Sequence, residues 1–278
     1  MKDKVVIITG ASSGIGKALA YEFSRHGSIV VIAARNIEQL HIIENSIRQQ
    51  GGTALAVQCD VSSEKDCHNL VTKTVEAFGR IDVLINNAGI SMRALFQDVE
   101  LDVLRRLMDV NFWGTVYCTK FALPYLLHTH GSVVGIISIA GHIGLPARTG
   151  YSASKFAIHG FLKTLRVENL KTGLHVLIAA PGFTASNIRM TALTASGKMQ
   201  GETPRNESKM MSAEKVASKI YRAVLHRRRS LILTMIEGKL TVFFSKWLPG
   251  LVERSSFRRM AREPNSPLQK EEVNHRAE

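Results

Sequence analysis

Short apolar runs rich in Val and Ile alternate with longer amphipathic segments along most of the chain. The apolar runs predict strands, at Val5–Thr9, Ile29–Ala34, Ala54–Cys59, Val83–Asn86, Ser132–Ser138 and Val176–Ala180. The amphipathic segments predict helices, among them Lys17–His26, Glu38–Gln50, Leu101–His128 and Ser152–Lys171. Strands that are apolar throughout are typical of parallel sheets buried on both faces. The alternation therefore predicts an α/β fold, a doubly wound parallel sheet with helices on both faces.

The chain is expected to form one domain over residues 1–235, followed by a short extension. Within the domain, Gly182–Met211 has no sustained period and is expected to be a mobile loop. Residues 236–263 predict an amphipathic C-terminal helical segment, because apolar side chains recur there at helical spacing. These side chains are Leu240, Phe243, Phe244, Trp247, Leu248 and Leu251. Residues 264–278 are polar and are expected to be disordered.

The apolar face of this extension has three interpretations. It covers a substrate pocket, it joins a second subunit, or it lies on an anionic membrane surface beside Lys246 and Arg254. A helix that spans a membrane is disfavoured, because charged residues and Pro249-Gly250 interrupt the apolar run.

Composition and charge limit the function classes. The chain is 45% hydrophobic and 21% charged, as expected of a globular protein with a full core. Its net charge of +13 is uneven, since the residues from Arg205 onward hold 16 Lys and Arg against 8 Asp and Glu. These basic residues lack interleaved aromatic side chains, so no nucleic-acid partner is expected. The three cysteines lack the spacing of a metal site, and no signal peptide is evident, so we expect no metal and a cytoplasmic location.

A glycine motif follows the first predicted strand and opens the first predicted helix. Its residues are Thr9, Gly10, Ala11, Ser12, Ser13, Gly14, Ile15 and Gly16. Glycines allow a pyrophosphate to approach the backbone, and the N-terminus of the following helix offers N–H groups and a positive dipole end. The motif therefore predicts a dinucleotide site, although its spacing, Gly-x-x-x-Gly-x-Gly, differs from the commoner pattern.

Arg35 follows the second predicted strand, where NAD-binding proteins place an acidic residue. A guanidinium there suits the 2′-phosphate of NADPH, with Ser12 or Ser13 as a further donor. Asp60-Val61 ends the third strand and is expected to reach the adenine of the cofactor, although an Asp at a strand end also forms turns. Asn87, Ala88 and Gly89 follow the fourth strand at the same edge of the sheet.

Ser138, Tyr151 and Lys155 form the most specific pattern. Tyr151 and Lys155 are four residues apart, which puts both side chains on one face of a helix. An ammonium so placed favours the phenolate, and we expect the pKa of Tyr151 to fall from about 10 toward neutrality. Such a tyrosine can act as general acid toward a carbonyl group or as general base toward an alcohol.

The chain resembles the short-chain dehydrogenase/reductase family from Val5 to about Leu233. The motifs that carry the resemblance occur in the family's order and are the glycine motif, Asn86-Asn87-Ala88-Gly89, Asn111, Ser138, Tyr151, Lys155 and Pro181-Gly182. The resemblance implies a Rossmann-type fold and a nicotinamide cofactor, here NADPH. It also implies that the substrate oxygen is bound by Ser138, that the proton is transferred by Tyr151, and that the nicotinamide ribose is bound by Lys155.

The resemblance assigns further roles. It implies that Asn111 holds a water molecule that relays protons to Lys155, whereas the residue itself also permits a local backbone contact. It implies that Pro181 and Gly182 shape the nicotinamide site. Ser186 stands where the family has Thr, so a hydroxyl for the carboxamide is retained.

The function predicted from these residues is NADPH-dependent interconversion of a ketone and a secondary alcohol, which is oxidoreductase chemistry on CH–OH and C=O groups. The expected pocket walls are mostly apolar and include Met92, Leu95, Phe96, His142, Ile143, Leu145 and Met190. They suit an apolar or lipid-like substrate, and the chain resembles the branch of 3-ketosphinganine reductases and lipid or steroid carbonyl reductases. A 3-oxoacyl substrate is a further candidate.

Two further expectations concern the chain as a whole. A non-catalytic NADPH-binding regulator on the same fold is the alternative function. The resemblance implies a homodimer or homotetramer, paired through the helices Leu101–His128 and Ser152–Lys171. Peripheral membrane association through the C-terminal segment stays open.

Overall fold

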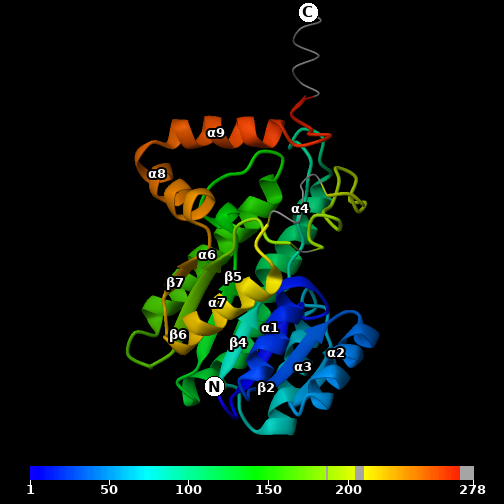
Figure 1. Cartoon of the computed structure of the whole chain (residues 1–278), viewed down its shortest axis with the longest axis vertical. Coiled ribbons are helices and arrows are strands. Elements are labelled where there is room, and N and C mark those ends of the chain that lie inside the picture. Colours follow the sequence, from blue (N-terminus) through cyan, green and yellow to red (C-terminus); the bar gives the residue numbers. More distant parts are fainter. Residues whose placement is uncertain (186, 204–209, 270–278) are drawn as a thin grey trace, which may run out of the picture.

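The computed structural model describes residues 1–185, 187–203 and 210–269. One sheet of seven parallel strands forms its centre, in the order β3-β2-β1-β4-β5-β6-β7 (Figure 1). The strands are β1 (Val5–Thr9), β2 (Ile29–Ala34), β3 (Ala54–Gln58), β4 (Val83–Asn86), β5 (Ser132–Ile136), β6 (His175–Ala180) and β7 (Ser230–Ile232). Ile7 of β1 pairs with Val31 of β2 on one side and with Leu84 of β4 on the other. The order reverses between β1 and β4, where sheets of this kind bind ligands.

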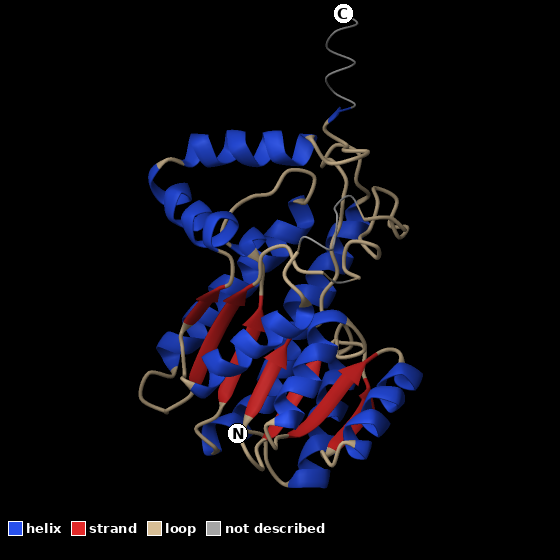
Figure 2. Cartoon of the chain, in the orientation of Figure 1, coloured by secondary structure: helices blue, strands red, loops and turns tan. Residues whose placement is uncertain are grey.

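Helices cover both faces of the sheet (Figure 2). Successive residues of each strand point to opposite faces, so β1 gives Val6 and Ile8 to one core and Val5 and Ile7 to the other. The first core is closed by α1 (Gly14–Arg25), α2 (Ile37–Gln49) and α7 (Ala213–Leu225). The second is closed by α3 (Glu64–Phe78), α5 (Gly114–His128) and α6 (Thr149–Glu168). The structure confirms the predicted Rossmann-type fold.

The predicted helix Leu101–His128 has three parts. They are α4 (Leu101–Leu107), a π-helical segment (Met108–Trp113) and α5. The π-helical segment contains Asn111, whose side chain is fully buried. A wide turn of this kind inside a helix re-aims side chains and often occurs at functional sites.

The C-terminal extension folds back over the carboxyl ends of the strands (Figure 1). A π-helical segment (Met235–Leu240) leads into α8 (Thr241–Trp247), and α9 (Pro249–Ala261) follows at a sharp turn. The apolar residues from Leu240 to Leu251 therefore do not form one continuous helix. Leu248 has φ −134° and ψ 58°, which is not helical. It directly precedes Pro249, and the helical conformation is sterically disfavoured for a residue before a proline. Among the described residues, no helix is both long and apolar enough to cross a membrane.

The expected disorder from residue 264 onward differs from the structure in its first part. Ser266 and Leu268 are buried, and Leu268 is only 5% exposed. The backbone carbonyl of Pro264 accepts a hydrogen bond from the buried Arg93 side chain, which ties this segment to the domain. The remaining residues of that prediction, 270–278, lie outside the described residues.

Candidate active site

The loop between β1 and α1 requires glycine at its closest contacts. Gly10 and Gly14 have positive φ angles of 64° and 52°. A Cβ atom on Gly10 would lie 2.7 Å from the Cα atom of Ala88, and one on Gly16 would clash with the carbonyl oxygen of Gly10. Only glycine adopts these angles and distances without strain. The loop therefore presents bare backbone at the carboxyl edge of the sheet.

The residues around this loop fit a phosphorylated dinucleotide. Ser13 is the N-cap residue of α1, and in the described structure its side chain makes no capping hydrogen bond. The first N–H groups of α1 therefore face the loop together with the positive end of the helix dipole. Ser12 is half-buried, and Ile15 lines the cavity described below. Arg35 is exposed directly after β2, the strand beside β1, so its guanidinium is accessible to a ligand at this edge.

Asn87 supports the glycine loop. Its side-chain amide nitrogen donates hydrogen bonds to the carbonyl oxygens of Thr9, at 2.9 Å, and Gly10, at 3.2 Å. The Thr9 hydroxyl in turn accepts hydrogen bonds from the backbone N–H groups of Asn87 and Ala88. Asn87 and Gly89 line the cavity, and their contact with a cofactor stays a prediction. The amide nitrogen of Asn87 is nevertheless committed to the backbone, so this group positions the loop.

Asp60 forms a turn. Its carboxylate accepts hydrogen bonds from the backbone N–H of Ser62, at 3.0 Å, and from the Ser62 hydroxyl, at 2.7 Å. This is the turn geometry that the residue type alone also predicted. Val61 is buried against Gly114, where a Cβ atom would lie 2.8 Å from the Val61 side chain. Neither residue lines the cavity, and the contact with adenine stays a prediction.

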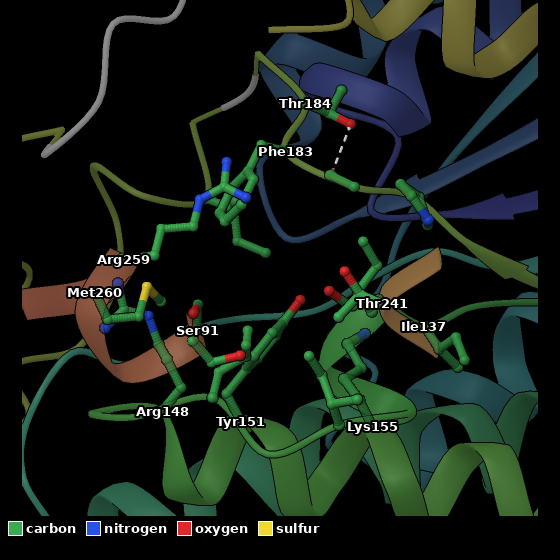
Figure 3. A pocket seen from close by; sticks show the side chains of 18 of the residues that line it. Ser91, Ile137, Arg148, Tyr151, Lys155, Phe183, Thr184, Thr241, Arg259 and Met260 are labelled. Atoms are coloured by element: carbon green, nitrogen blue, oxygen red, sulfur yellow. Dashed lines mark hydrogen bonds between the residues drawn. The ribbon is translucent and has the colours of Figure 1, made fainter. Parts of the chain in front are cut away.

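Ser138, Tyr151 and Lys155 line one cavity, at the place where β5 and α6 approach each other. The hydroxyl of Tyr151 points into this cavity, with Lys155 beside it (Figure 3). The ammonium of Lys155 lies 5.7 Å from the centre of the Tyr151 ring and donates a hydrogen bond to the carbonyl oxygen of Ile136, at 3.0 Å. Two groups one helical turn apart on α6 therefore face the same space, as the spacing predicted.

The pKa shifts at this pair differ from the expectation. The pKa of Tyr151 is raised above its ordinary value because burial partly removes the phenol from water, and a hydrogen bond from Ser138 opposes this only in part. The pKa of Lys155 is lowered to about 8, also by burial. The predicted fall of the tyrosine pKa toward neutrality is therefore wrong for this structure. Removal from water disfavours the phenolate more than the neighbouring charges favour it.

Asn111 is held by the backbone rather than directed at Lys155. Its side chain accepts a hydrogen bond from the N–H of Ile90, at 2.8 Å, and donates one to the Ile90 carbonyl oxygen. A third bond, at 2.8 Å, joins its amide nitrogen to the hydroxyl of Ser154. The side chain thus fixes the position of Ile90 after β4, a backbone contact across 21 positions rather than the local one that was the alternative, and the proton relay stays a prediction. Asn111 and Lys155 both approach Gly89, where a Cβ atom would lie 3.0 and 3.3 Å from their polar atoms.

The segment after β6 closes the same cavity. Pro181, Gly182 and Thr184 line it, and a Cβ atom on Gly182 would lie 2.7 Å from the Thr234 side chain. Glycine at this position therefore lets the segment pack under the C-terminal extension. Ser186, the predicted hydroxyl for the cofactor carboxamide, lies outside the described residues.

The cavity has a volume of about 660 Å³, and the C-terminal extension forms much of its wall. The apolar residues that the extension contributes are Leu240, Phe244, Leu248, Leu251, Val252 and Met260. Of the three interpretations of this segment, the structure therefore supports a cover over the pocket. Ile143 and Leu145 line the cavity as predicted, whereas Met92 is buried in a separate apolar cluster.

A buried ionic contact fastens α9 to the domain. Glu263, 5% exposed, lies 3.7 Å from Nε of Arg93 and 3.4 Å from Nη2 of Arg148. Arg148 directly precedes α6 and is three residues from Tyr151, so the C-terminal extension contacts the start of α6. A substitution that removes the Glu263 carboxylate is therefore expected to loosen the cover of the cavity.

The sequence interpretation missed three arginines in the cavity wall, Arg148, Arg189 and Arg259. Arg148 and Arg189 both act electrostatically on Tyr151 and favour its phenolate. The position of Arg148 could have been predicted from the sequence, because it lies three residues before Tyr151 and this spacing places two side chains on the same side of a helix. No local pattern distinguishes Arg259 from the other basic residues of α9.

The family model described as short chain dehydrogenase matches residues 4–196. The chain belongs to this family. Among its relatives, dehydrogenase/reductase SDR family member 7B of Mus musculus is 33% identical over 271 residues, covering 96% of this chain and 84% of the mouse protein. The 11-beta-hydroxysteroid dehydrogenase A of Sesamum indicum is 37% identical over 246 residues, covering 88% of this chain and 69% of the plant protein.

A solved structure of the family has the same fold. It is an alcohol dehydrogenase from the archaeon Thermococcus sibiricus in complex with 5-hydroxy-NADP, with a TM-score of 0.73 and 25% sequence identity. The likeness covers 84% of this chain and 96% of the archaeal chain. These relatives are oxidoreductases that act on CH–OH and C=O groups, and the archaeal structure carries a nicotinamide cofactor. The expected short-chain dehydrogenase/reductase membership is therefore confirmed.

Proposed function

We propose that the chain is an NADPH-dependent oxidoreductase that interconverts a ketone and a secondary alcohol on an apolar or lipid-like substrate. The observation that carries this proposal is the convergence of Ser138, Tyr151 and Lys155 on one cavity that reaches Ile15 of the glycine motif and Asn87, which supports the glycine loop. A proton donor and a nicotinamide site in one apolar cavity are what carbonyl reduction requires.

The residues of the glycine loop, Arg35 and Lys155 would hold NADPH. When bound, the cofactor supplies a hydride to the carbonyl carbon. The backbone N–H groups at the start of α1 suit the pyrophosphate, and the Arg35 guanidinium suits the 2′-phosphate. The retained glycines at positions 10 and 16 support this assignment, since any Cβ there would meet backbone atoms.

The side chains of the cavity would handle the proton and the developing charge. Tyr151, whose raised pKa keeps the phenol protonated, donates its proton to the substrate oxygen. The Ser138 hydroxyl stabilises the negative charge that develops on that oxygen. Lys155 lies close enough to favour the phenolate that Tyr151 leaves behind. Asn111 positions the backbone of Ile90, the residue after Gly89, which the Lys155 ammonium approaches.

The proposed substrate is apolar because apolar side chains of α8 and α9 and of the segment after β5 line the cavity. Steroids fit this description, and relatives of the chain are named as 11-beta-hydroxysteroid dehydrogenases. A 3-ketosphinganine-like or 3-oxoacyl substrate fits it as well. The non-catalytic NADPH-binding regulator stays the alternative.

The proposal is tested with a ketone panel. The purified chain is incubated with NADPH or NADH and with 3-ketosphinganine, a steroid ketone and a small polar ketone, with and without lipid vesicles. We expect oxidation of NADPH by an apolar ketone. Tight binding of NADPH without oxidation by any ketone would favour the regulator, and good reduction of only the small polar ketone would reject the lipid-like substrate.

The rate of ketone reduction is expected to fall above a pH of about 8. Burial lowers the pKa of Lys155 to about 8, whereas it raises the pKa of Tyr151. As the pH rises, Lys155 therefore loses its charge first, and a phenolate forming beside it is no longer stabilised. The measurement is kcat between about pH 6 and about pH 10. A wild-type profile without a descending limb in this range contradicts the assignment of Lys155.

We also propose that the outer face of the extension rests on an anionic membrane surface while its inner face covers the cavity. Phe243 and Trp247 of α8 are 58% and 72% exposed and do not line the cavity; Lys246 lies between them in the sequence, and Arg254 follows on α9. Exposed aromatic side chains beside basic residues are typical of interfacial helices.

Replacing both Phe243 and Trp247 by Ser is expected to weaken binding to phosphatidylserine-containing vesicles by about tenfold or more. The measurement is co-sedimentation of the full chain with these vesicles and with phosphatidylcholine vesicles. Ile42→Ser is the matched control, because Ile42 is 61% exposed on α2, outside the extension. Equal vesicle binding by the wild type and the double variant would contradict the proposal.

Self-association through α5 and α6 stays a prediction. It is supported by exposed apolar side chains on these helices, among them Tyr125, Phe156 and Val167. Exposed apolar groups on neighbouring helices are common in subunit interfaces.

A further inference from the structure

A groove adjoins the cavity under α9. It has a volume of about 530 Å³ and lies between α9 and the loop that precedes α6, residues 143–148. Figure 1 shows α9 across the top of the molecule, with this loop beneath it. The proposed chemistry gives the groove no role. Its walls include Gly144 and Pro146 of the loop and Arg254, Ser256, Phe257 and Arg258 of α9.

A wall one residue thick separates the groove from the cavity. Along the loop, Ile143 and Leu145 line the cavity. Gly144 and Pro146, which alternate with them, line the groove instead. On α9, Ser256 lines both spaces. Successive residues of an extended segment point to opposite sides, so this loop has the cavity on one side and the groove on the other.

Hydrogen bonds do not fasten this wall to α9. In the described part of the chain, neither Gly144 nor Pro146 is hydrogen-bonded to α9, and the backbone N–H of Leu145 donates to the Ser152 hydroxyl of α6. The contact of Arg148 with Glu263 lies beyond the C-terminal end of α9. Loop and helix can therefore part beside Gly144 without loss of a polar contact, which is a low-cost local opening.

The cofactor would close the opposite approach to the cavity. The cavity reaches Ile15 and Asn87 beside the glycine loop, and NADPH held there would fill that side. A ketone that joins the bound cofactor therefore needs a second approach. The groove lies on the α9 side, and Gly144, Pro146 and Phe257 give it an apolar wall that suits the proposed substrate.

We propose that the apolar ketone enters the cavity through this groove, and that the space beside Gly144 limits which ketones pass. This inference rests on the proposed function and adds the route by which the substrate reaches the same site. A Cβ atom on Gly144 would meet no atom within 4 Å, so a larger side chain there extends into open space. Gly144 is not among the glycines with a positive φ angle, so a substitution brings no backbone strain.

The test fills this space in steps, with Gly144→Ala, Gly144→Leu and Gly144→Trp in the full chain. The measurement is stopped-flow binding of an alcohol to the NADPH complex, followed by NADPH fluorescence. The alcohol is the product of whichever ketone, 3-ketosphinganine or the steroid ketone, is reduced faster. An alcohol cannot accept the hydride, so binding is measured without turnover. We expect the association rate constant to fall with side-chain size, by at least about tenfold for Trp.

A barrier on the route slows entry and exit alike. The dissociation rate constant is therefore expected to fall together with the association rate constant, and the dissociation constant of the alcohol to stay within about threefold of the wild type. Gly250→Trp is the matched control and is expected to bind the alcohol at the wild-type rate. Gly250 also belongs to α9 and also has open space around its Cβ position, but it lines neither the groove nor the cavity.

Each outcome decides the inference. Association of the alcohol with the Leu and Trp variants at the wild-type rate overturns the entry route and leaves the proposed function intact. A weaker equilibrium affinity without slower association also overturns it, because the new side chain then acts on the bound alcohol. If melting curves show that the Trp variant is unfolded, the comparison of Ala with Leu decides by the same criterion. No reduction of any ketone by the wild type, together with normal NADPH binding, overturns the proposed function and the inference with it.

Discussion

Replacing Tyr151 by Phe is expected to abolish measurable turnover. The substitution removes only the hydroxyl that points into the cavity, and with it the proton that the substrate oxygen needs. General acid catalysis of this kind contributes about 10²- to 10⁴-fold to the rate, so kcat is expected to fall by that range or more. The measurement is the rate of NADPH oxidation with the best ketone of the panel.

Two controls make this prediction specific. The dissociation constant of NADPH is expected to stay within about threefold of the wild type, because the glycine loop and Arg35 do not change. Tyr125→Phe is the matched control, since Tyr125 is an exposed tyrosine of α5 outside the cavity. A Tyr151→Phe variant with near-normal turnover would remove Tyr151 from the proposed role.

Replacing Arg35 by Ala is expected to weaken NADPH binding by about 10- to 100-fold, because hydrogen bonds to a charged phosphate contribute about 1.5–3 kcal/mol. Binding of NADH, which has no 2′-phosphate, is expected to change by less than about threefold. The measurement is a fluorescence titration of the wild type and the variant with NADPH and with NADH. It gives the cofactor preference from dissociation constants, independently of turnover.

The control for Arg35 is Arg105→Ala. Arg105 is an exposed arginine of α4, paired with Asp102 at 2.6 Å, and it lies outside the cavity. Its replacement is expected to leave the affinity for both cofactors unchanged. If the wild type binds NADH as tightly as NADPH, Arg35 does not select the cofactor.

The sheet and its strands were predictable because their signals are local. Each buried strand is a continuous apolar run, and five of the six strands named from the sequence agree with the structure to within one residue at either end. The exception is β5, which ends at Ile136, because Ser138 has already turned to begin the next segment. The edge strand β7 was not predicted, since Ser230–Ile232 has three residues and gives no periodic signal.

The positions of the candidate catalytic side chains were predictable for the same reason, whereas the direction of the pKa shift of Tyr151 was not. Tyr151 and Lys155 share a face of α6 because helical spacing requires it. The sign of the pKa shift of Tyr151 depends on how much water the surrounding elements exclude, and these elements lie far apart in the sequence. Burial of this kind is a property of the whole fold.

The cover of the cavity was predictable only in part. The apolar spacing from Leu240 to Leu251 indicates an amphipathic segment, but it does not say what the segment packs against. Its position depends on the contact of Glu263 with Arg93 and Arg148, residues separated by more than a hundred positions. Long-range ionic contacts leave no pattern in a single sequence.

The central claim, that a ketone is reduced at Tyr151 by a nicotinamide cofactor, is tested most directly by isotope transfer. NADPH with deuterium at its transferable position is incubated with the chain and the best ketone of the panel, and the alcohol is analysed by mass spectrometry. We expect alcohol with one deuterium on its carbinol carbon from the wild type, and no alcohol above background from the Tyr151→Phe variant. Tight cofactor binding without any labelled alcohol from the wild type would contradict it.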